Sequence, residues 1–504
     1  MLSAPPPSRA PRKLASQLRV LHVQLREQVP APQAQGGRTL TAEHHMRLLE
    51  HARACLGEMH ICAEELGNEA GLSRSRSVGE ADEIVAELQR TQWAVSIWEL
   101  ALLVFVRRPL VLGENFGLWW RRHWSNSDAE DELRQLSEQP ASELCQLQDL
   151  GNFWRTLRKL IAQGLPERAL ELLLLHPQLR ASNVPGGASA NTTLDTLLFR
   201  LEQLLEHIPR LTSPELLQPS PGDAHLRASG GAELSSFTLV WRVWREDVAQ
   251  LLGHAEAAAH SDGEAKQVFE TLQLLSGDET AIAKATGGEW HSRLLARLML
   301  VEPTRLRWEM RDLLPLSEAH EPGVRAMLAI LADDPYATIS AVRAFHGDGW
   351  LLVHLYDLLW RARSVELSAM SIESNHPTHS TLDTRQFFIL QYAKALGARD
   401  ALWQLAVEYA ADVNVEGRVC EEARALIGEL LECHLKLPLH AVKVRKLLRI
   451  CERHDLHDCA ASILTSYEAS QRDKRGAAPA VAKLAAAAQP LEGRLTGDVV
   501  SAEE

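Results

Sequence analysis

The sequence predicts an all-α protein, an irregular α-helical solenoid of stacked antiparallel helix pairs. Almost every segment between residues 41 and 467 repeats apolar residues at positions i, i+3, i+4 and i+7. No series of alternating apolar and polar residues indicates strands. Helix pairs recur without a strict period, and each pair leaves an apolar face that the next pair would cover.

The two ends differ from this central region. Residues 1–40 are rich in proline and glycine around one leucine-spaced stretch, so we expect a flexible N-terminal arm with a marginal helix. Residues 468–504 are polar and then alanine-rich, which predicts a disordered C-terminal tail. The solenoid is therefore expected to span residues 41–467.

Individual helices are indicated by their apolar faces and by the residues that stop them. A leucine face over 194–208 ends at Pro209, which lacks the amide donor of a further turn. Ser235 and Ser236 offer an N-cap for a helix that would end at Gly253. Helix–turn–helix units are predicted around the turns 163–166 and 454–457.

Composition and motifs exclude several classes of function. The 504 residues include 53 Lys and Arg against 66 Asp and Glu, a net charge of −13, so nucleic acid is not an expected direct partner. The longest largely apolar run, 98–106, which includes Glu99, is shorter than the roughly 20 residues of a membrane span. Seven scattered cysteines indicate reduced thiols. Phosphate-binding, nucleophile-elbow and paired-histidine zinc motifs are absent, so no enzyme activity, cofactor or small-molecule substrate is expected.

The nearest approach to a metal site is formed by Cys451, His454, His457 and Cys459. Thiolates and imidazoles are zinc ligands, and four of them are present. The spacing lacks paired knuckles, however, and Cys451 shares a predicted helix face with Leu447. We interpret the cysteines as core thiols and predict no metal site.

His354 and Asp357 lie one helical turn apart, the spacing of a general base and the carboxylate that orients it. No motif supplies a nucleophile. An intrahelical hydrogen bond or a helix cap is the preferred interpretation, and no catalytic residue is predicted.

Two more groups of residues are candidates for contacts with other molecules. Trp119, Trp120, Trp241 and Trp244 could line a peptide groove, but their helical spacing favours core packing. A short alternation of serine and arginine could accept phosphate at Ser73, Ser75 and Ser77. No protein-binding residue is assigned from the sequence.

The order of several blocks along the chain resembles the nucleoporin-85 family, the scaffold subunit of the Y-shaped outer-ring complex of the nuclear pore. Each block alone is ordinary helix core, whereas their colinear order is specific. The blocks are NFW at 152–154, WRVW at 241–244, SGDE at 276–279, EWH at 289–291, GW at 349–350, FILQYA at 388–393, LWQL at 402–405 and LRICE at 448–452.

The resemblance implies a structural scaffold nucleoporin at the nuclear envelope that supports pore assembly, protein transport and mRNA export. Its implied partners are other Y-complex nucleoporins, among them a WD-repeat β-propeller subunit. Longer members look as though they add N-terminal strands to that propeller and carry a further helical tail. Neither is evident here, so we expect a chain shortened or truncated at both ends. An adaptor of a vesicle coat or signalling complex is the alternative, and a metal-dependent hydrolase is a distant third.

Overall fold

The computed structural model describes residues 9–29, 41–72, 78–124, 128–138, 147–182, 193–211, 224–315, 320–345, 349–365, 382–399, 401–415, 418–433 and 440–475. Within these ranges the regular structure is helical, apart from one hairpin of two-residue strands and an isolated β-bridge. The predicted all-α class is confirmed. The helices fall into two compact units that divide between residues 373 and 374.

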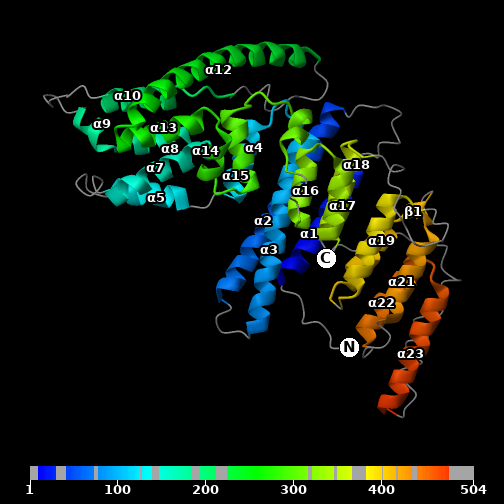
Figure 1. The fold of residues 1–504 in the computed structure, drawn as a ribbon. Coiled ribbons are helices and arrows are strands. Elements are labelled where there is room, and N and C mark those ends of the chain that lie inside the picture. Colours follow the sequence, from blue (N-terminus) through cyan, green and yellow to red (C-terminus); the bar gives the residue numbers. More distant parts are fainter. Residues whose placement is uncertain are drawn as a thin grey trace, which may run out of the picture. The chain divides into compact units, whose positions relative to one another are not determined.

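The first unit contains three consecutive groups of helices (Figure 1). The early helices are α1 (Arg9–Gln28), α2 (Ala42–Leu72) and α3 (Val78–Ala101), which continues as a π-helical segment, Leu102–Arg107. The middle helices are α4 (Gly113–His123), α5 (Asp128–Glu138), α7 (Leu147–Ala162), α8 (Pro166–Leu173), α9 (Pro177–Ser182), α10 (Thr193–Glu206), α12 (Ala224–Ala259), α13 (Gly263–Leu275), α14 (Glu279–Ala285) and α15 (Trp290–Leu300). After a 3-10 helix, Arg307–Leu313, the late helices are α16 (Pro322–Leu331), α17 (Pro335–Phe345) and α18 (Trp350–Arg361).

The late helices return to the early helices instead of extending the stack. Helix α16 packs against α3, and α18 packs against α2. The guanidinium of Arg361 in α18 donates to the carbonyl oxygen of Val29, just after α1. Figure 1 shows α16 beside the blue early helices. The predicted solenoid of stacked helix pairs is confirmed, because neighbouring helices pack against each other. In this unit the late helices also cover the early ones, so the first unit closes on itself.

Helix α1 also differs from the expected flexible arm. Its buried residues include Leu14, Leu18 and Leu25, which recur at helical spacing along one face. This face packs against α2, so tertiary contacts supply the stability that a lone helix of this length lacks. Residues 9–29 are therefore a packed helix and its end, and the remainder of the predicted arm lies outside the described residues.

Helix α12 is longer than predicted at both ends, since neither Ser235 nor Gly253 interrupts it. A buried stripe continues past Gly253 to Ala255, and Phe237 stacks on Trp241 with ring centroids 6.0 Å apart. Packing of this continuous stripe outweighs the cost of about 1 kcal/mol that a glycine imposes inside a helix.

The predicted turn between α7 and α8 is confirmed. Gly164 adopts φ +67°, a left-handed conformation that glycine takes without steric cost. Pro166 then occupies the first turn of α8, where its missing amide hydrogen costs nothing.

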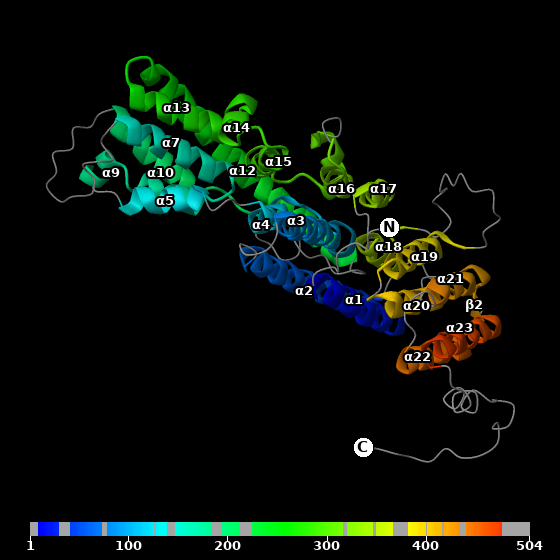
Figure 2. The same ribbon diagram turned by 90° about the horizontal axis from the view of Figure 1, so that it is seen from below.

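The second unit contains α19 (Thr384–Gly397), α20 (Trp403–Ala411), β1 (Asn414–Val415), β2 (Arg418–Val419), α21 (Glu421–Cys433), α22 (Ala441–Arg453) and α23 (His457–Arg475) (Figure 2). Helix α19 contacts α20, α20 contacts α21, and α22 contacts α23, as expected for successive pairs. The predicted turn at 454–457 is confirmed between α22 and α23. Helix α23 includes residues 468–475 of the predicted tail, and residues 476–504 lie outside the described part.

Candidate functional site

The predicted pair His354 and Asp357 lies in a buried polar cluster between α18 and the early helices. Asp357 is fully buried, and one of its oxygens, Oδ2, accepts a hydrogen bond of 3.0 Å from Nε of Arg361, one turn further along α18. The same oxygen lies 3.8 Å from Nδ1 of His22 in α1. Arg361 is thus an intrahelical hydrogen-bond donor to Asp357. The ring of His354 instead meets the ring of His22 edge to face, with centroids 5.5 Å apart.

Two histidines of this cluster, His354 and His51, are neutral in the folded protein. Burial lowers the pKa of His354 to about 3 and that of His51, in α2, to about 4. Nε2 of His51 lies 3.4 Å from Sγ of Cys55, whose pKa is raised by burial. An imidazole with so low a pKa is a weak base at neutral pH, so these contacts contribute packing and hydrogen bonding.

The predicted core thiols meet between α22 and α23. The side chains of Cys451 and Cys459 form a hydrogen bond, and burial raises the pKa of Cys451 to about 12. His454 follows the end of α22, while His457 is exposed at the start of α23. Among the described residues, no group of three or more histidine, cysteine or carboxylate side chains is arranged to hold a metal ion. The absence of bound metal remains a prediction.

The four tryptophans singled out from the sequence are buried, which confirms the core interpretation. Nε1 of Trp120 donates to Nδ1 of His291, at 2.9 Å, and Nε1 of Trp244 donates to the carbonyl oxygen of Leu204, at 3.0 Å. The indoles of Trp120 and Trp244 therefore each have a hydrogen-bond partner as well as apolar contacts. The serines at 73, 75 and 77 lie outside the described residues.

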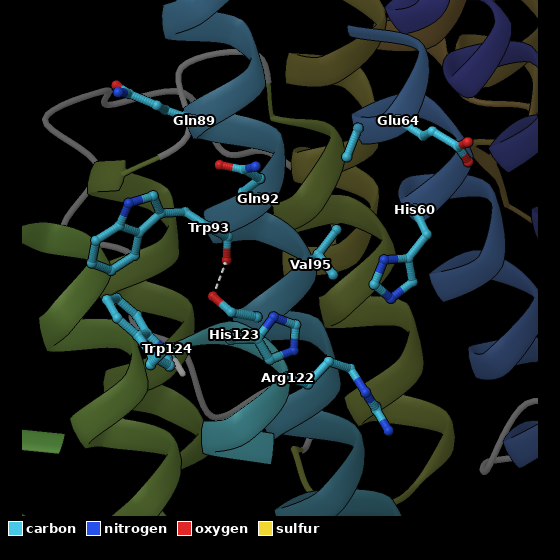
Figure 3. Close-up of a pocket in the computed structure, with 11 residues that line it drawn as sticks. His60, Glu64, Gln89, Gln92, Trp93, Val95, Arg122, His123 and Trp124 are labelled. Carbon is cyan, nitrogen blue, oxygen red and sulfur yellow. Dashed lines mark hydrogen bonds between the residues drawn. The ribbon is translucent and has the colours of Figure 1, made fainter. Parts of the chain in front are cut away.

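A groove between α2, α3 and the end of α4 was not predicted (Figure 3). Its volume is about 590 Å³, within the range of roughly 300 to 1,000 Å³ typical of ligand pockets. The lining side chains come from α2 (His60, Ala63, Glu64), from α3 (Gln89, Gln92, Trp93, Val95, Ser96) and from the end of α4 and beyond (Arg122, His123, Trp124). Figure 3 shows the two tryptophans on one side and His60 and Glu64 on the other.

The aromatic side of this groove is held rigidly. Trp93 meets Trp124 edge to face, with ring centroids 5.4 Å apart, and packs near Phe345 of α17. Behind Trp93 lies Gly323 of α16, where an added Cβ would come within 2.6 Å of Cε3 of the indole. Only glycine allows α16 to approach the indole this closely.

The two basic side chains at the end of α4 are already paired. Glu99 of α3 forms an ion pair with Arg122 and accepts a hydrogen bond of 2.6 Å from Nε2 of His123. Burial, followed by the nearby charge of Arg122, lowers the pKa of His123 to about 4, so its ring is neutral. One sequence signal for this groove was available, the spacing of Gln89, Gln92, Trp93 and Ser96 along one face of a helix. Glutamines on a helix usually indicate a solvated face, however, so this spacing did not predict a groove.

Stacked antiparallel helices of this kind define the class of α-helical solenoid proteins. None of the described helices is both long and apolar enough to span a membrane. The chain belongs to the Nup85 nucleoporin family, because the model of that family, described as Nup85 Nucleoporin, matches residues 7–482.

Curated relatives agree with this assignment. The human nuclear pore complex protein Nup85 is 26% identical over 447 residues, which cover 84% of this chain and 58% of the human protein. The Xenopus tropicalis protein of the same name is 24% identical over 429 residues, 82% of this chain and 55% of the relative. The Danio rerio protein is 25% identical over 381 residues, 73% and 50% respectively. The chain thus spans little more than half the length of these relatives.

Proposed function

We propose that this protein is a structural scaffold nucleoporin of the outer-ring Y complex, placed at the nuclear pore in the nuclear envelope. In that role it supports pore assembly, protein transport and mRNA export. The family match over 7–482, which takes in every described helix, carries the proposal. The self-closing first unit supports it, because helices that brace one another over a long stretch of sequence make a stiff support.

The partners we propose are other outer-ring nucleoporins, a WD-repeat β-propeller subunit among them. These contacts would use extended helical surfaces. One exposed candidate is the row Leu239, Val240 and Val243 on α12, with each side chain close to 60% exposed. No catalytic role is proposed, since the groups resembling a catalytic pair are buried and neutral or ion-paired. The adaptor alternative is not favoured, because the family is one of nucleoporins.

Localisation and co-purification of the tagged full chain test this proposal. We expect a punctate nuclear rim and recovery of outer-ring nucleoporins after affinity purification. Labelling of cytoplasmic membranes without a rim, together with recovery of vesicle-coat subunits, would contradict the proposal and favour the coat adaptor.

A further inference from the structure

The groove between α2 and α3 combines a fixed apolar wall with uncharged hydrogen-bonding groups. Trp93 is half-buried and is held from behind by Gly323 and from the side by Trp124. Because the indole is already ordered, a side chain that packs on it would not have to pay the entropic cost of ordering the wall.

The polar groups of the groove match an amide ligand. Gln89 and Gln92 are exposed, and each primary amide both donates and accepts hydrogen bonds, as does a peptide group. The neutral ring of His123 donates through Nε2 to Glu99, which leaves Nδ1 as the acceptor of this imidazole. The side-chain amides of Gln89 and Gln92 and the acceptor Nδ1 of His123 can therefore hydrogen-bond the alternating N–H and C=O groups of an extended peptide backbone.

The charges at the groove disfavour an anionic ligand. Arg122 is engaged by Glu99, so its guanidinium is not a free anion site. Glu64 opposes anions from the other side of the groove. The site therefore selects an uncharged chain over a phosphate or carboxylate group.

We propose that this groove binds an extended peptide segment of a partner protein. A large aliphatic or aromatic side chain of the peptide packs on Trp93, and Gln89 and Gln92 hydrogen-bond its backbone. Val85, one turn before Gln89 on the same face of α3 and 42% exposed, contacts the next apolar residue of the peptide. The proposal rests on the scaffold role proposed above, because it assigns the groove to a segment of another protein.

Selection of random peptides displayed on phage against the purified full chain tests the proposal. We expect enrichment of peptides with a large apolar residue. The double substitution Gln89→Arg and Gln92→Arg should weaken their binding about tenfold or more, since it removes two amide partners. Both glutamines are exposed, so folding should be unaffected. The matched control is Gln250→Arg at an exposed position of α12, which should leave binding unchanged.

Two further measurements test where the peptide binds and whether its contacts are uncharged. A photo-crosslinking amino acid in place of Val85 should capture the selected peptide, whereas the same group in place of Gln250 on α12 should not. Binding should change little with salt, because the contacts are uncharged. Failure to enrich any peptide, equal binding by the double variant, or strong salt dependence would overturn the proposal. Rim localisation of the wild-type chain tests the scaffold role separately, so either idea can fail alone.

Discussion

The ion pair in α18 provides the sharpest test of how the first unit is held together. Arg361→Met removes the guanidinium that pairs with the fully buried Asp357 and that donates to the carbonyl of Val29. Two unit charges about 4 Å apart attract each other by about 4 kcal/mol at an effective dielectric constant near 20. Breaking a buried pair from one side typically costs about 3 to 5 kcal/mol, because the remaining charge stays buried.

The expected result is local opening of α1 from the rest of the unit. Hydrogen exchange of the full chain, followed by mass spectrometry, should show amides of α1 and α18 exchanging about 100-fold faster or more, the ratio that follows from a loss of 3 kcal/mol. The matched control is Arg168→Met, which breaks an exposed pair with Glu171 whose atoms Nη1 and Oε2 lie 2.7 Å apart. Exposed pairs contribute about 1 kcal/mol or less, so exchange in α8 should change little.

A double substitution separates the lost ion pair from a general packing defect. Arg361→Met combined with Asp357→Leu removes both charges, and apolar replacement of a buried pair is often tolerated. Part of the lost protection in α1 should return. Unchanged exchange of α1 in Arg361→Met would refute the reasoning, because the pair would then not hold α1 in place.

Three other predictions concern buried aromatic, titratable and thiol groups. Trp241→Ala should lower the free energy of unfolding by about 3 to 5 kcal/mol, visible as an earlier thermal transition, and an unchanged transition would contradict its role in the core. Stability should decrease as the pH falls from about 6.5 towards 4, because the unfolded chain protonates histidines such as His51 and His354 that stay neutral when folded; urea titrations across that range check this, and a flat profile would count against it. Strong chelators should leave the melting temperature unchanged, whereas stoichiometric zinc that disappears in a Cys451→Ala, Cys459→Ala variant would restore the metal-site interpretation.

Local features of the fold could be predicted from the sequence, because their causes are local. The leucine face of α10 and its stop before Pro209 depend on residues within a few turns of each other. So does the turn at Gly164, which needs a left-handed conformation.

Features that depend on tertiary packing could not be predicted in this way. Gly253 is a helix stop by local propensity, but the buried stripe of α12 continues past it. The return of α18 to α1 leaves no periodic signal, because it joins residues that are far apart in sequence. The groove beside Trp93 is hidden for the same reason, since its rigid wall needs α16 and the end of α4.

The closure of the first unit has a consequence for synthesis of the protein. Val29 and Arg361 are separated by 332 positions in the sequence. At a translation rate of about 5 to 20 residues per second, synthesis of α18 follows that of the early helices by roughly 20 to 60 seconds. During that interval His22 of α1 and the carbonyl of Val29 lack their partners from α18. Surfaces that stay uncovered for this long during synthesis are prone to aggregation.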